Sequence, residues 1–141
     1  IVGEGSEAVY LEHKYASEKV IFVGKRFNKD LTNEFHNASC FVLPSLSEQW
    51  GLVVNEALSS GLPVIATKEV GSCHDLIEGR ETGFIAENNI EIGEKMLELF
   101  EDENLLKKYS VNAIRLMKEY WNYNFYNQCL NNAIKKVDQW R

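Results

Sequence analysis

Two glutamates, Glu48 and Glu56, lie on either side of Gly51 in the middle of the chain. Helical spacing of the apolar residues that follow predicts a helix over residues 51–60. The first backbone N–H groups of a helix have no partners within it, and they carry the positive end of the helix dipole. Because Gly51 has no side chain, a phosphate group can approach these N–H groups closely. The pattern therefore indicates a diphosphate site at the start of this helix.

The two carboxylates fit a ligand with hydroxyl groups, because an ionised carboxylate only accepts hydrogen bonds. Glu48 precedes the predicted helix and Glu56 lies within it, where its neighbours are apolar: Val53, Val54, Ala57 and Leu58. A carboxylate in apolar surroundings is costly unless a partner pairs with it, and sugar hydroxyls are such partners. Taken singly, each residue has a commoner interpretation: Glu48 as an exposed loop acid, Glu56 as a solvent-facing helix residue and Trp50 as part of the core.

The elements that must position these residues alternate between strands and helices. Apolar runs with the length of buried strands lie at residues 20–23, 41–43, 63–66 and 83–85, and residues 1–2 are typical of a strand end. Helical spacing falls between them at residues 7–16, 30–38 and 51–60. This alternation predicts right-handed βαβ units and a parallel sheet, with ligands bound beyond the carboxyl ends of the strands. Those ends are the loops at residues 3–5, 24–28, 44–51 and 67–71.

Beyond Ile90 the pattern changes to helices alone. One helix is marked by Met96, Leu97 and Phe100, and a second runs from Leu105 to Tyr120. Residues 121–124 interrupt the helical pattern, and a final helix is predicted from about Phe125 to the end. The sequence therefore predicts an α/β fold with a helical C-terminal tail.

Composition and charge exclude several classes of protein. The chain has 141 residues, of which 45% are hydrophobic and 26% charged, a mixture typical of a globular domain. Its net charge of −6 argues against a dedicated nucleic-acid binder, which usually carries a basic patch. The three cysteines, Cys40, Cys73 and Cys129, form no CxxC pair, so neither a zinc site nor a disulfide framework is indicated. A reducing, cytoplasmic compartment fits this cysteine usage.

The segment around the two glutamates resembles the donor-binding signature of retaining glycosyltransferase family 4, whose members have the GT-B fold. The similarity includes the E-x7-E motif from Glu48 to Glu56, and it extends over residues 1–5, 20–24, 38–45, 56–66, 70–71, 75–77 and 82–85. It therefore spans essentially the whole chain. It implies a Rossmann-like parallel sheet sandwiched by helices, which is the C-terminal half of a GT-B enzyme.

The resemblance also implies roles for individual residues. Glu48 matches the motif glutamate beside the donor sugar and is the candidate catalytic residue. The family stretch whose backbone amides contact the sugar and the diphosphate corresponds here to Gln49, Trp50, Gly51, Leu52 and Val53. Glu56 matches the glutamate that binds the ribose hydroxyls of the nucleotide. The base is bordered by Arg26, Phe27 and Asn28, and the same cleft is bordered by Gly3 and Gly5.

The implied reaction transfers a sugar from a UDP-sugar or GDP-sugar to an acceptor hydroxyl, with retention of the anomeric configuration. Preorganised dipoles and cations stabilise the departing diphosphate. The resemblance implies no metal and no other cofactor. The chain has no DxD motif, and residues 101–103 belong to a helical acidic run away from the sheet edge.

The family places an Arg/Lys pair, a first strand and helix, and an N-terminal acceptor domain upstream of the residues matched here. We therefore expect residues 1–141 to be a truncated donor-binding domain that is inactive alone and binds nucleotide weakly. Lys25, Arg26 and Lys29 lie at the wrong place to replace the cationic pair. The expected partners are the nucleotide-sugar donor and the protein's own N-terminal domain, with no nucleic acid. The expected location is the cytoplasm or the inner face of a membrane, where the full-length protein associates peripherally in polysaccharide biosynthesis.

Two alternatives remain open at this point. One is a non-catalytic nucleotide-binding or interaction domain of the same fold, and the other is a phosphorylase or synthase that shares this half. An upstream Arg/Lys pair and N-terminal domain in a longer gene product favour the transferase.

Three features depart from the family pattern or are not explained by it. Ser72 replaces the second of two common glycines, and because it keeps a backbone N–H, the loop is still able to contact the donor. His74 has no expected catalytic role. The tail carries an aromatic cluster of Tyr120, Trp121, Tyr123, Phe125, Tyr126 and Trp140. Core packing is its first interpretation, contact with the N-terminal domain the second and contact with a membrane surface the third.

Overall fold

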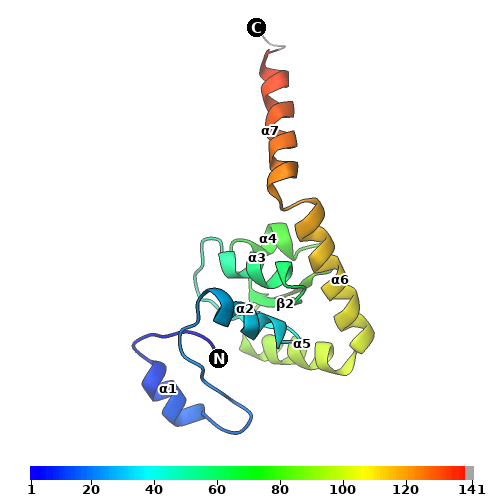
Figure 1. Ribbon diagram of the computed structural model, residues 1–141. Helices are drawn as coiled ribbons and strands as arrows, with labels where there is room; N and C mark the ends of the chain where they lie inside the picture. The colour runs from blue at the N-terminus through cyan, green and yellow to red at the C-terminus, as the bar shows by residue number, and fades with distance from the viewer. Residues whose placement is uncertain (139–141) are drawn as a thin grey trace. The chain divides into compact units, whose positions relative to one another are not determined.

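The structure, a computed structural model, describes residues 1–138 and divides the chain into two compact units (Figure 1). The first unit is Ile1–Asn37, and the second begins at Ala38. No composition typical of a linker marks this division in the sequence. Among the described residues, every helix is too short or too polar to cross a membrane.

The first unit contains helices α1 (Ala8–Tyr15) and α2 (Asn28–His36). Its two predicted strand ends lie side by side: Val2 and Gly24 form an isolated parallel bridge, and the Gly3 N–H donates to the Gly24 carbonyl at 2.9 Å. The strand predicted at residues 20–23 is wrong. Among the described residues, that run pairs only with residues 1–3, and Ile21 is 63% exposed rather than buried on both faces.

The second unit is built on a parallel sheet of three strands in the order β1, β2, β3. The strands are β1 (Phe41–Leu43), β2 (Val64–Thr67) and β3 (Gly83–Ala86), close to three of the predicted runs. All four residues of the central strand β2 are buried, which explains its continuous apolar sequence. The predicted α/β class with a parallel sheet is therefore confirmed.

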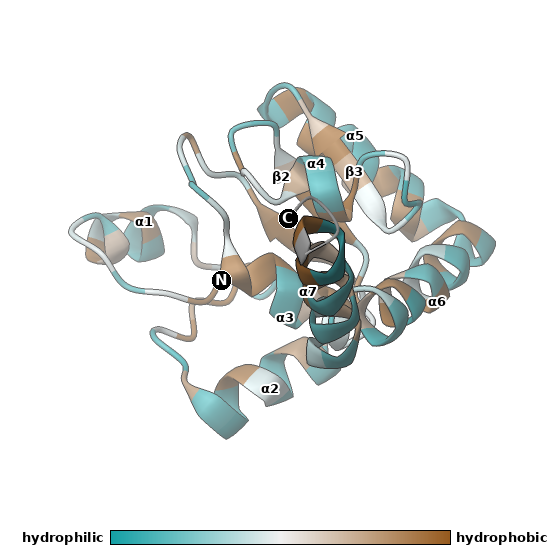
Figure 2. Ribbon diagram, turned by 90° about the horizontal axis from the view of Figure 1, so that it is seen from above, coloured by the Kyte–Doolittle hydropathy of each residue, from teal (hydrophilic) through white to brown (hydrophobic). Residues whose placement is uncertain are grey.

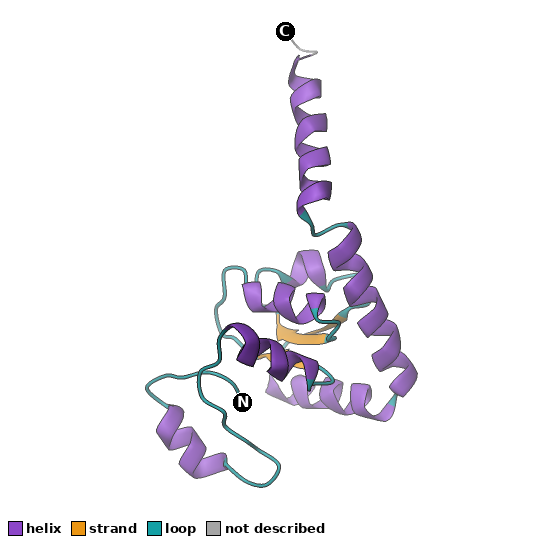
Figure 3. Ribbon diagram, in the orientation of Figure 1, coloured by secondary structure: helices purple, strands orange, loops and turns teal. Residues whose placement is uncertain are grey.

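Helices cover both faces of this sheet (Figure 3). Helix α3 (Leu52–Ser59) packs on β1 and β2, and α5 (Asn89–Glu101) packs on β2 and β3. Helix α6 (Glu103–Glu119) contacts both α3 and α5. One core cluster joins the sheet to α5 and contains Ile65, Ala86, Ile92 and Leu99. The short helix α4 (Cys73–Leu76), which follows β2, was not predicted from the sequence.

Side-chain caps set the boundaries of the long helices. The Asn88 Oδ1 accepts from the N–H groups of Ile90 and Glu91, and the Asp102 carboxylate accepts from those of Asn104 and Leu105. The acidic residues 101–103 therefore form the junction between α5 and α6, with Asp102 as a cap.

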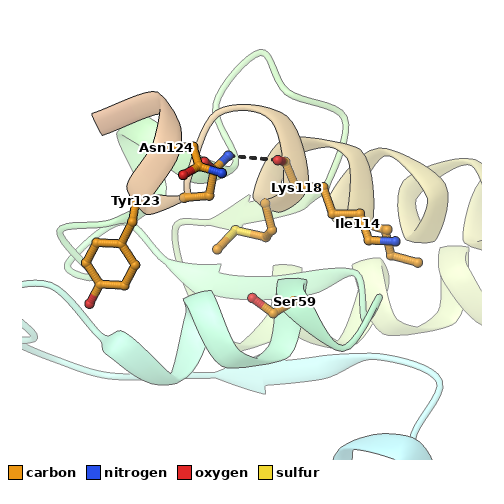
Figure 4. Close-up of a pocket in the computed structure, with 7 residues that line it drawn as sticks. Ser59, Ile114, Lys118, Tyr123 and Asn124 are labelled. Carbon is orange, nitrogen blue, oxygen red and sulfur yellow. Dashed lines mark hydrogen bonds between the residues drawn. The ribbon is translucent and has the colours of Figure 1, made fainter. Parts of the chain in front are cut away.

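The predicted interruption of the tail is confirmed, and the last helix, α7 (Tyr123–Asp138), begins two residues earlier than expected. Asn122 holds both sides of the break: its Nδ2 donates to the Lys118 carbonyl at 2.7 Å, and its Oδ1 accepts from the Phe125 N–H at 2.9 Å. Figure 4 shows the small pocket beside the break, with Ser59 of α3 opposite Lys118 and Tyr123. Helices α6 and α7 alternate between hydrophobic and hydrophilic residues along their length (Figure 2).

Candidate functional site

The loops that leave β1 and β2 pair with each other at the carboxyl edge of the sheet. The Glu48 N–H donates to the Glu69 carbonyl at 3.1 Å, and the Gly71 N–H donates to the Glu48 carbonyl at 2.9 Å. The Ser72 N–H donates to the Trp50 carbonyl at 3.0 Å. These bonds fix the backbone of the loop that carries the first motif glutamate, just before α3 begins.

The pairing requires a glycine at position 71. A Cβ added to Gly71 would lie 2.0 Å from the Gln49 carbonyl oxygen, which is backbone and cannot rotate away. The glycine thus allows the loop after β2 to approach the loop after β1 closely.

The Ser72 N–H is not free in the structure, because the Trp50 carbonyl accepts it. This N–H group takes part in the pairing of the two loops, and nothing in the local sequence reveals that pairing. The Ser72 hydroxyl is fully buried and has no hydrogen-bond partner among residues 1–138.

The start of α3 presents free hydrogen-bond donors. Gly51 precedes the helix with φ 83° and ψ 65°, a left-handed conformation that favours glycine, and no side chain caps the helix. The first helix-type bond that involves Gly51 runs from the Val54 N–H to the Gly51 carbonyl at 2.8 Å. Within the described part of the chain, the N–H groups of Gly51, Leu52 and Val53 have no acceptor. The helix predicted to start near Gly51, with unpartnered N–H groups, is therefore confirmed.

Glu48 lies beside these donors. Its side chain is half-buried, and its Oε1 accepts from the Trp50 N–H at 3.3 Å. A Cβ added to Gly51 would lie 3.2 Å from the Glu48 Cγ, so the glutamate side chain borders the turn that opens α3. A negative charge in this position is stabilised by the positive end of the helix dipole.

Glu56 does not have the apolar surroundings predicted for it. Its side chain is exposed, and it lies one turn after Leu52, which is 71% exposed. The buried face of α3 consists of Val54, Ala57 and Leu58. Neighbours in sequence point about 100° apart around a helix, so apolar neighbours do not bury Glu56. The burial argument for a ligand at this carboxylate is therefore wrong.

Trp50 is the most connected side chain of the loop. Its Nε1 donates to the Asn55 Oδ1 at 2.9 Å. Its ring packs against Trp121, with a centroid distance of 5.5 Å and an interplanar angle of 42°. Sequence reasoning missed both partners. Trp121 is 71 positions away from Trp50, and no local pattern connects the two.

The remaining predicted site residues belong to the first unit. The Gly3 N–H donates to the Gly24 carbonyl, and Asn28 is the first residue of α2, with a φ of 49°. The Arg26 Nε donates to the Glu34 Oε1 at 3.3 Å, while Phe27 is exposed. The bridge between residues 2 and 24 brings the predicted loops 3–5 and 24–28 together within this unit.

The surroundings of Cys40 and Cys73 disfavour the reactive thiolate. Burial raises the pKa of Cys73 to about 11, and burial also raises the pKa of the half-buried Cys40. Both thiols therefore stay protonated at neutral pH. Cys73 contacts the Thr67 carbonyl at 3.5 Å and packs in the core, as a small buried hydrophobe does.

The tail aromatics are not core residues, so the first interpretation of them is wrong. All the described members are exposed: Tyr120, Trp121, Tyr123, Phe125 and Tyr126. They line a cavity of about 810 Å³ together with Leu52, Asn55 and Met117. Trp140 lies outside the described residues.

Comparison with known proteins decides the family. The model of the family described as glycosyl transferases group 1 matches residues 1–116. The chain belongs to this family.

Relatives and solved structures agree with this assignment. A sucrose synthase from Denitrovibrio acetiphilus is 32% identical over 98% of this chain and 20% of its own length. A GDP-mannose-dependent alpha-mannosyltransferase from Mycobacterium tuberculosis is 38% identical over 60% of this chain and 22% of its own length. The chain thus spans about a fifth of these relatives.

Two solved structures share the fold. A sucrose-phosphate synthase from Thermosynechococcus elongatus has a TM-score of 0.76 and 22% identity, over 96% of this chain and 34% of that one. Anabaena Alr3699/HepE, solved in complex with UDP-glucose, has a TM-score of 0.75 and 22% identity, over 96% of this chain and 40% of that one. The likeness confirms the Rossmann-like sheet flanked by helices, as in GT-B glycosyltransferases.

Proposed function

We propose that this glycosyl transferases group 1 chain is the donor-binding part of a retaining glycosyltransferase of family 4 type. It binds a nucleoside diphosphate sugar, and the complete protein transfers the sugar to an acceptor hydroxyl. The observation that carries this proposal is the row of free N–H groups at Gly51, Leu52 and Val53. These donors lie at the carboxyl edge of a parallel sheet, where such folds bind their ligands.

The chemistry of the leaving group explains why this arrangement suits the reaction. Breaking the bond between the sugar and the phosphate builds negative charge on the diphosphate. Fixed N–H donors at the positive end of α3 stabilise that charge without reorganising. Because these donors are backbone groups, the site fits a chain of net charge −6 and is proposed to work without a metal ion. The amides of Gln49 and Trp50 complete the proposed contact with sugar and diphosphate, and the Trp50 N–H exchanges its 3.3 Å contact with the Glu48 Oε1 for the donor.

The two glutamates are proposed to contact different parts of the donor. Glu48 borders the turn at Gly51 and is proposed to lie beside the donor sugar as the catalytic residue. Glu56 lies four residues into α3 from Leu52, about 6 Å along the helix axis. Its exposed carboxylate is free to accept hydrogen bonds from the ribose hydroxyls.

The family resemblance also suggests proposed roles for residues of the first unit, taken here by themselves. Arg26, Phe27 and Asn28 border the base, and Gly3 and Gly5 border the cleft. A UDP-sugar or a GDP-sugar is the proposed donor. Two similar proteins support this choice: a GDP-mannose-dependent alpha-mannosyltransferase and Alr3699/HepE, which was solved in complex with UDP-glucose.

The complete protein is proposed to add an N-terminal acceptor domain and an Arg/Lys pair, so that the present chain is inactive alone. We place it in the cytoplasm or peripherally at the inner face of a membrane, in polysaccharide biosynthesis. The chain spans about a fifth of the sucrose synthase and of the mannosyltransferase compared above, which supports a role as one part of a larger enzyme.

Replacement of Leu52 tests the free N–H groups directly. Proline is well tolerated at the first position of a helix, and Leu52→Pro removes one of the three N–H donors. Loss of one hydrogen bond to a charged group is expected to weaken UDP binding about tenfold or more, as measured by titration calorimetry.

Leu52→Ala is the matched control, because it removes the same side chain and keeps the N–H group. It is expected to bind UDP like the natural chain, and circular dichroism verifies that both variants are folded. Equal UDP affinity in the two variants contradicts the proposed role of the N–H groups. No heat with UDP, GDP or their sugars contradicts donor binding by this chain.

A further inference from the structure

The break between α6 and α7 holds Trp121 in a defined place. The Trp121 N–H donates to the Leu116 carbonyl at 3.2 Å, and the hydrogen bonds of Asn122 fix the turn that follows. Trp121 is 38% exposed, and its ring packs on Trp50 at 5.5 Å between ring centroids. The start of the tail therefore contacts the loop that precedes α3.

Trp50 is the point at which three parts of the candidate site meet. Its N–H donates to the Glu48 Oε1, its carbonyl accepts from the Ser72 N–H, and its Nε1 donates to Asn55 on α3. Its ring also packs on Trp121. A shift of this ring would move the Glu48 side chain and the backbone that leads to Gly51.

We propose that Trp121 is a positioning residue for the candidate diphosphate site. By packing on Trp50, it holds the loop of residues 45–51 in the conformation that presents Glu48 and the free N–H groups. The role in donor binding rests on the proposed function, whereas the role in ordering the loop does not. The inference links the tail of the molecule to the loop through one aromatic pair.

Amide hydrogen exchange tests the ordering of the loop without any ligand. The amides of Gly71 and Ser72 report on the pairing, because they donate to the Glu48 and Trp50 carbonyls. In Trp121→Ala both amides are expected to exchange faster, while the Ile92 amide in α5 keeps its rate. A loss of global stability would accelerate all three amides alike.

Two variants make the comparison specific. Trp121→Phe keeps an aromatic ring and is expected to restore slow exchange at Gly71 and Ser72. Tyr123→Ala removes a neighbouring tail aromatic that is 87% exposed, and it is expected to change neither amide. The paired indoles are also expected to give an exciton signal in circular dichroism that Trp121→Ala abolishes.

UDP titration of the same variants tests the link to donor binding. Loss of an aromatic pair is expected to weaken UDP binding about three- to tenfold in Trp121→Ala, with no change in Tyr123→Ala. Exchange rates and UDP affinity that match between these two variants overturn the inference. If the natural chain binds no UDP, the proposed function fails, and the exchange rates alone decide whether Trp121 positions the loop.

Discussion

At the residue scale, the candidate site depends on small groups rather than on unusual side chains. Gly51 turns the chain with a positive φ, so that α3 begins with its N–H groups free. Gly71 lets the loop after β2 approach the Gln49 carbonyl. Glu48 adds a carboxylate at the same place, held by the Trp50 N–H. The chemistry proposed here therefore requires exact backbone geometry at two glycines.

Gly71→Ala tests that geometry. The added Cβ would collide with backbone at 2.0 Å, so the two loops must separate. We expect unfolding in urea to show a loss of about 1–3 kcal/mol in stability, together with weaker UDP binding.

Gly93→Ala is the matched control, because Gly93 lies in α5 with open space around its Cα. Alanine is the better helix former, so this variant is expected to gain up to about 1 kcal/mol. If Gly71→Ala were as stable as the natural chain, the close approach of the loops would be refuted.

At the element scale, the sequence predicted the helices and strands whose formation depends on the local pattern of apolar residues. The buried strands β1, β2 and β3 and the break before α7 follow from apolar runs and from interrupted periodicity. The run at residues 20–23 failed because burial on both faces needs partner strands, and it pairs only with residues 1–3. The prediction that apolar side chains surround Glu56 failed for another reason: its sequence neighbours lie on a different face of α3.

Prediction of the candidate site from the sequence has the same limit. The free N–H groups of α3 follow from the start of a helix, which the sequence indicates. The use of the Ser72 N–H and the contact of Trp50 with Trp121 depend on segments that are distant in sequence. Such contacts leave no periodic signal in one sequence.

The junction of α5 and α6 gives a prediction at this scale. The Asp102 carboxylate accepts from the N–H groups of Asn104 and Leu105, each at 3.0 Å. Asp102→Ala is expected to cost about 1 kcal/mol of stability in urea unfolding, because both donors lose their partner. Glu101→Ala removes the neighbouring acid and no cap, so a comparable loss there would show that general charge is responsible instead.

At the scale of the whole molecule, the two units differ in how much they bury. The second unit holds the sheet and the cluster around Ile65, whereas α1 in the first unit has no buried residue. The proposed diphosphate donors all belong to the second unit, and the residues proposed to border the base belong to the first.

The most direct test of this account is a titration of the isotope-labelled chain with UDP, followed by the backbone amide signals in nuclear magnetic resonance. The account predicts that the amides of Gly51, Leu52 and Val53 shift most within the second unit, because they are the proposed donors to the diphosphate. The Ile90 and Glu91 amides, already bonded to Asn88 at the start of α5, are expected to stay in place. Unchanged signals at Gly51, Leu52 and Val53, with or without shifts elsewhere, would contradict it.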